Sequence, residues 1–89
     1  GKGRLERVYF LEHEGDLLLL YEVSDKVSEW AYLVRMEQKK RKARWLTPLS
    51  RPAVGPPIIK GDLVVFGEEG QEGRSIEINK TDGRVLRIE

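Results

Sequence analysis

The chain has 89 residues, of which 39% are hydrophobic and 35% charged, with a net charge of +1 and no cysteine. This length fits one domain, or two small repeated units that share a core, and the many charges of both signs resemble the composition of thermophile proteins. The composition excludes a disulfide framework and a cysteine-based metal site, and no apolar run is long enough to cross a membrane as a helix. Gly1 to Arg4 lacks the apolar segment of a secretory signal, so we expect a cytoplasmic protein.

Four strands are predicted in the first half of the chain, with polar turns between them: Leu5–Leu11, Leu17–Tyr21, Trp30–Met36 and Ala43–Thr47. The second of these has no alternation of apolar and polar residues, which predicts a central strand that is covered on both faces. The third strand does alternate, so that one face should carry Trp30, Tyr32, Val34 and Met36. The aromatic residues Trp30, Tyr32 and Trp45 are expected to pack in the core or at a sheet edge.

A proline-rich segment separates this half from a second set of strands. All four prolines fall between Thr47 and Pro57, which is typical of an extended linker. Leu63–Phe66, Ile76–Ile78 and Arg84–Glu89 then read as strands, and Gly83 is expected at a turn position with positive φ. We therefore predict a β-meander unit over 1–47, a linker over 48–57 and a second β-meander unit over 58–89, together forming one compact domain.

The two halves resemble each other. The sequence Gly15-Asp16-Leu17 recurs as Gly61-Asp62-Leu63, 46 residues later, and Val34 and Met36 fall on Ile76 and Ile78 at a spacing of 42. Strand-rich repeats of about forty residues are typical of propeller blades and similar arrays.

The segment from Ser75 to Arg87 resembles the repeat of PQQ-like β-propellers, roughly L-Y-A-L-D-A-K-T-G-K-V-L-W, and Leu33–Trp45 has the same length and ends on the expected tryptophan. This chain departs from the pattern at Arg87, where the family prefers tryptophan, and in the Gln38–Arg41 turn, which has no glycine. The resemblance implies two blade-like units. Because many such repeats bind no quinone and act as scaffolds, it implies a fold more than a chemistry.

The clearest cluster of charge is basic. The segment Arg35–Arg44 contains six cations and one acid, a local charge of +5. With the aromatic ring that follows, such a segment could hold nucleic-acid phosphates and stack bases. The same residues would also suit a solvated hairpin tip whose charges discourage edge-to-edge pairing. The candidate anion or nucleic-acid contacts are Arg35, Lys39, Lys40, Arg41, Lys42, Arg44 and Trp45.

No catalytic or metal-binding pattern emerges from the remaining polar residues. His13, between two glutamates, lacks the further histidines or the carboxylate loop of a metal site. Gly67–Gly70 carries acids where a phosphate cradle would need a following lysine. The serines have neither a nucleophile-elbow context nor more than one histidine to act as a base. We therefore expect no enzyme activity, no metal and no cofactor.

The sequence as a whole predicts an all-β protein, an antiparallel meander of six to eight strands that forms two propeller-like blades or one small closed barrel. The expected function is a non-catalytic binding or assembly module, and the alternative is a small nucleic-acid-binding β protein that uses the basic hairpin Arg35–Trp45. The apolar runs Leu17–Tyr21 and Leu63–Phe66 need cover on both faces, so we expect a homo-oligomer or a larger protein assembly and no membrane partner.

Overall fold

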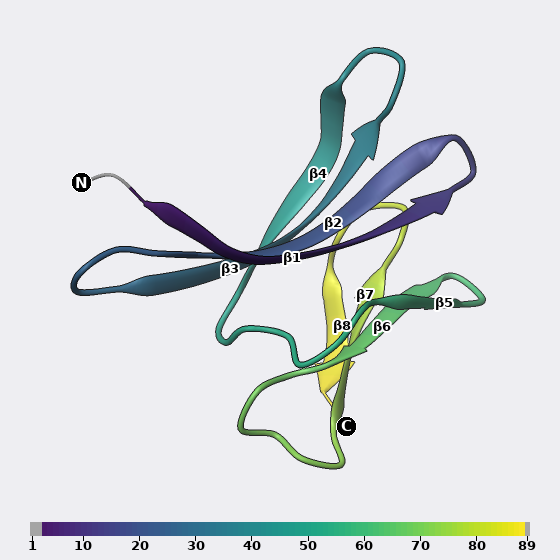
Figure 1. Ribbon diagram of the computed structural model, residues 1–89. Helices are drawn as coiled ribbons and strands as arrows, with labels where there is room; N and C mark the ends of the chain where they lie inside the picture. Colours follow the sequence, from purple (N-terminus) through teal and green to yellow (C-terminus); the bar gives the residue numbers. More distant parts are fainter. Residues whose placement is uncertain (1–2, 89) are drawn as a thin grey trace.

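The computed structural model describes the backbone of residues 3–88 and the side chains of residues 3–86, and within these the structure consists of two antiparallel four-stranded sheets (Figure 1). The first sheet contains β1 (Arg4–His13), β2 (Asp16–Ser24), β3 (Glu29–Glu37) and β4 (Lys42–Leu49). The second contains β5 (Ile58–Lys60), β6 (Leu63–Gly67), β7 (Ser75–Asn79) and β8 (Val85–Ile88). Strands neighbour one another in chain order in both sheets.

This architecture confirms the predicted all-β antiparallel meander. The sheets do not close on each other, so the small closed barrel is wrong, and the arrangement is consistent with two blade-like units. Residues 3–88 include no helix of the length and apolar character that a membrane crossing would need.

Each sheet turns an inner face toward the other sheet and an outer face away from it. The shared core is apolar and lies between the inner faces; its buried members are Leu18, Leu20, Leu33, Ala53, Val64, Phe66, Ile76 and Ile78. Tyr9, Leu11 and Trp45 pack against this cluster from the first sheet. In Figure 1 the first sheet lies above the second, and the linker joins them at one side.

The segment between the sheets also pairs with the end of β6 and the residue that follows it. β4 continues through Pro48 to Leu49, and Ala53 then forms an isolated antiparallel bridge with Glu68. The Val54 amide donates to the Gly67 carbonyl, at 3.1 Å. This pairing buries Ala53 and Glu68, so the linker seals one side of the core.

The hairpins β3–β4 and β7–β8 have the same construction, 42 residues apart. Met36 pairs with Ala43, as Ile78 pairs with Val85, and each pairing follows a register shift at the corresponding position. Both hairpins have a positive φ at the fourth residue of the turn, Arg41 at 52° and Gly83 at 77°. The expected positive φ at Gly83 is therefore confirmed.

Candidate functional site

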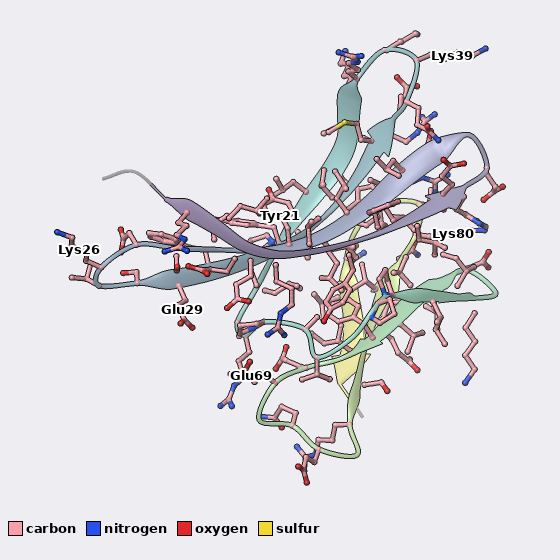
Figure 2. All side chains as sticks on the ribbon, in the orientation of Figure 1. Tyr21, Lys26, Glu29, Lys39, Glu69 and Lys80 are labelled. Carbon is pink, nitrogen blue, oxygen red and sulfur yellow. The ribbon has the colours of Figure 1, made fainter. Side chains whose placement is uncertain are left out.

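The basic segment forms the β3–β4 hairpin, and the structure divides its seven candidate residues into two groups. Four of them occupy the turn and the first position of β4, where all are exposed: Lys39, Lys40, Arg41 and Lys42. We call these four residues the basic tip; Figure 2 shows Lys39 at the end of this hairpin. The other three, Arg35, Arg44 and Trp45, turn toward the body of the protein and form contacts there.

Asp16 organises the two arginines. Its carboxylate is only 3% exposed and accepts hydrogen bonds from Arg35 Nε, at 2.7 Å, and from Arg44 Nε. Arg44 reaches back from the register shift of β4 and also pairs with Glu37, with 3.0 Å between Nη2 and Oε1. A buried carboxylate needs such partners because an unpaired charge there would be costly. Arg35 and Arg44 therefore hold the first sheet together.

The pKa of the Asp16 carboxyl lies below its ordinary value of 3.8, mainly because Arg44 donates a hydrogen bond to the charged form; burial opposes this effect, and the bond from Arg35 adds to it. The same contact raises the pKa of Arg44. Both groups are therefore charged at neutral pH, and their charges face each other rather than a ligand.

Lys80, the first residue of the β7–β8 turn, connects the two sheets. Its backbone carbonyl accepts hydrogen bonds from Arg35 Nη1, at 2.8 Å, and from Trp45 Nε1, at 3.0 Å. Its ammonium group lies 3.0 Å from the Glu14 carboxylate and 3.1 Å from His13 Nε2. The hydrogen bond from Lys80 is the main reason that the pKa of Glu14 is lowered. The indole of Trp45 is thus committed to the interface between the sheets and is not presented for base stacking.

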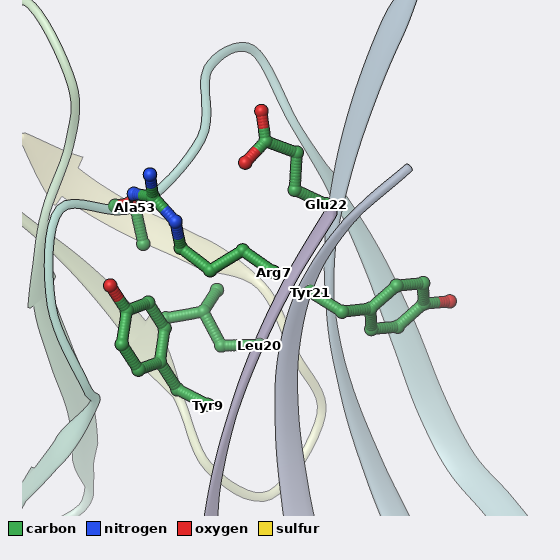
Figure 3. Close-up of a pocket in the computed structure, with 6 residues that line it drawn as sticks. All are labelled: Arg7, Tyr9, Leu20, Tyr21, Glu22 and Ala53. Atoms are coloured by element: carbon green, nitrogen blue, oxygen red, sulfur yellow. Dashed lines mark hydrogen bonds between the residues drawn. The ribbon is translucent and has the colours of Figure 1, made fainter. Parts of the chain in front are cut away.

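A small cavity, partly open to solvent, lies between β1, β2 and the linker, beside Arg7, Tyr9 and Ala53 (Figure 3). Its volume of about 10 Å³ can hold no more than one water molecule. Arg7 donates to the Ala53 carbonyl across it, at 3.3 Å, while Tyr21 points to the opposite side of the sheet. The cavity is a packing feature and has no room for a substrate. Within the described part of the chain, no three metal-binding side chains lie together.

The outer face of β1–β4 is a much larger feature than this cavity, and no part of the described chain covers it. Two rows of directly paired residues cross all four strands at its centre. One row consists of Phe10, Leu19, Val34 and Leu46, and the other of Val8, Tyr21, Tyr32 and Pro48. Neither row holds a charged residue. The rings of Tyr21 and Tyr32 lie 5.4 Å apart, and partial burial raises the pKa of Tyr21.

Much of this apolar face is accessible to solvent in the single chain. Phe10 is 68% exposed, Leu46 49%, Val8 44% and Trp30 40%. The predicted sharing of one face by Trp30, Tyr32, Val34 and Met36 is confirmed, because their partners in β2 also lie on the outer face. The prediction that Leu17–Tyr21 is covered on both faces holds for the inner face alone, where Leu18 and Leu20 are buried.

Sequence reasoning missed both the Asp16 pairing and the contacts of Lys80. Asp16 was visible only as the polar residue before an apolar run, and nothing in the sequence relates it to residues 19 and 28 positions away. Comparison with known proteins finds no family model and no curated protein that matches this chain.

Proposed function

We propose that this chain is a non-catalytic assembly module that packs the outer face of β1–β4 against another β-sheet. The observation that carries the proposal is the equivalence of the two hairpins. The outward-facing Val34 and Met36 of β3 correspond, at a spacing of 42, to Ile76 and Ile78 of β7. In β7 these positions are buried, because they form the face that packs on the first sheet.

In the register of these hairpins, the outer face of β3 is therefore the counterpart of the face of β7 that already packs on a sheet within the same chain. The size of the outer face of β1–β4 also favours docking. Strands of nine residues at about 3.3 Å per residue, four abreast at about 4.8 Å, give a footprint on the order of 550 Å². The largest apolar patch on a typical monomer is about 300–600 Å², and a patch of this size is often an interaction site. The resemblance to blade-like scaffold repeats points in the same direction.

The test is sedimentation velocity over a dilution series. We expect the parent to sediment above the mass of a 10.3 kDa chain, and the double variant Phe10→Ser, Leu46→Ser to sediment as a monomer. Both replaced side chains are largely exposed, so the variant should keep its fold. Ile58→Ser is the matched control, since Ile58 is 56% exposed on the outer face of the other sheet. Identical monomers for all three proteins would contradict the proposal.

The basic tip supports a second candidate, a nucleic-acid contact. Its four cations are exposed, and none forms an ion pair with another described residue. Arg41 also holds a φ of 52°, a conformation that glycine would adopt at lower cost. A cation at a position where the backbone is strained is a reason to test that position for a function.

The test of this candidate is the binding of single- and double-stranded oligonucleotides at low salt. If the tip contacts phosphates, replacing Lys39, Lys40, Arg41 and Lys42 with glutamine should abolish binding, and the parent should lose affinity steeply as salt rises. The matched control is Lys26→Gln, a cation in an exposed turn at the other end of the sheet. A parent with no affinity for either form would remove the nucleic-acid candidate.

A further inference from the structure

We infer that the sheet that covers the outer face of β1–β4 is the same face of a second copy, related by a two-fold axis that runs across the strands. This inference rests on the proposed assembly function and names its partner. A two-fold contact brings one surface patch against itself, so the patch must be compatible with its own chemistry.

Each copy has four sheet faces, and three of them are poor partners for a second copy. The inner faces are occupied by each other. The outer face of β5–β8 is built on strands of three to five residues and has about half the length of the first sheet. Its paired positions include the polar residues Lys60, Ser75 and Asn79. Burying these polar groups against an apolar sheet would carry a desolvation cost.

The outer face of β1–β4 meets none of these objections. Its two central rows contain no charged residue, so a self-contact creates no like-charge pair at its centre. Its footprint, on the order of 550 Å² before side-chain relief is counted, approaches the roughly 800 Å² per partner of a standard interface. Two aligned sheets pack face to face in the same way in β-sandwiches.

Charge at the two ends of the sheet selects the direction of the axis. The β3–β4 hairpin at one end carries the four cations of the basic tip, while residues 25–29 in and after the β2–β3 turn at the other end have a net charge of −1 (Figure 2). A two-fold axis along the strands would set one basic tip over the other. An axis across the strands sets each basic tip over the opposite end of its partner, which removes that repulsion.

The experiment uses intermolecular paramagnetic relaxation enhancement. A nitroxide is attached to Lys39→Cys, a unique thiol because the chain has no cysteine, and this protein is mixed with isotope-labelled parent. We expect broadening of the parent's amide signals at residues 25–29. Leu46→Glu in the isotope-labelled copy should abolish this broadening, and Ile58→Glu in the same copy should leave it unchanged.

Three outcomes would overturn the inference, and they bear differently on the proposed function. Broadening at residues 38–41 would mean that the axis runs along the strands. Broadening along β5 and β6 would mean that copies stack head to tail. In both cases the assembly function stands and the inferred two-fold contact falls. No broadening together with a monomer in sedimentation would remove both.

Discussion

The two outer faces of this molecule differ although the hairpins that build them are alike. β3–β4 and β7–β8 share the position of their register shift and a positive φ at the fourth residue of the turn. Outward from β1–β4, the central positions are apolar across four long strands. Outward from β5–β8, the positions paired with Val65 and Leu63 include Glu77 and Asn79. In stacked repeats a polar outer face marks a terminal unit, and an apolar one marks a unit that needs a neighbour.

The largest expected effect is a difference in stability between variants of Asp16 and Asp62, the two aspartates that the Gly-Asp-Leu repeat aligns. Asp16→Ala should lower the free energy of unfolding by about 3–5 kcal/mol, because it removes the carboxylate closest to the nearly buried Arg35. Asp62→Ala, at the equivalent position, should change it by less than about 0.5 kcal/mol, since Asp62 is exposed. Urea unfolding of both variants measures the difference, and equal losses would contradict the role assigned to Asp16.

Acid should weaken both the ion pairs of Asp16 within the first sheet and the contact of Glu14 with Lys80 between the sheets. The pKa values of Asp16 and Glu14 lie below their ordinary 3.8 and 4.5. A carboxyl whose pKa is lowered by folding stabilises the protein above its unfolded pKa, and this contribution is lost as pH falls through the folded value. We therefore expect the contribution of these two carboxyls to the free energy of unfolding to be constant near neutral pH. It should decrease as the pH falls below about 5.

The control for the acid effect is Asp16→Asn combined with Glu14→Gln. This protein should be less stable than the parent at pH 7 and should lose less stability between pH 5 and pH 3. A parent and a double variant with parallel pH profiles would show that other carboxyls govern the acid response.

Gly83 and Gly15 both have positive φ, but only Gly83 also lies against the other sheet. A Cβ at this position would lie 2.6 Å from the Trp45 ring, whereas a Cβ at Gly15, with φ 79°, would meet nothing within 4 Å. Gly83→Ala should therefore cost about 2–4 kcal/mol and Gly15→Ala about 1 kcal/mol. Thermal unfolding of both variants tests the contrast; similar losses would mean that Trp45 can move aside.

The smallest expected effect has the opposite sign. Arg41 occupies in its turn the position that Gly83 occupies in the other, so Arg41→Gly should relieve a left-handed backbone and stabilise the protein by about 0.5–1 kcal/mol. Lys40→Gly, whose φ is not positive, is the matched control and should not stabilise. Destabilisation by Arg41→Gly would show that its side chain has contacts that the fold depends on.

Local patterns were enough to predict much of the fold. Alternation in Trp30–Met36 identified two faces of one strand, and Thr81-Asp82-Gly83 identified the last turn. β5 was not predicted as a strand because its three residues directly follow the prolines. Alternation also cannot say which face is covered, since that depends on where the other sheet docks.

Long-range contacts account for the part of the candidate site that the sequence did not predict. Arg35 and Arg44 looked like free cations, yet strand register brings both to Asp16. Glu68 looked like part of an exposed acidic turn, yet its bridge to Ala53 buries it to 6% exposure. The exposed residues of the basic tip were the part that local sequence could identify, because a hairpin turn is solvated wherever the sheet packs.

Hydroxyl-radical labelling tests most directly whether the outer face of β1–β4 is covered in solution while that of β5–β8 is open. In the single chain Phe10 is 68% exposed and Ile58 is 56% exposed, so each serves as a reporter of its own sheet. The account predicts that Phe10 is strongly protected in the folded parent, relative to the urea-unfolded chain, and regains labelling in the Leu46→Glu variant, while Ile58 is labelled equally in both folded proteins. Labelling of Phe10 in the parent at the level of its 68% exposure would contradict the account.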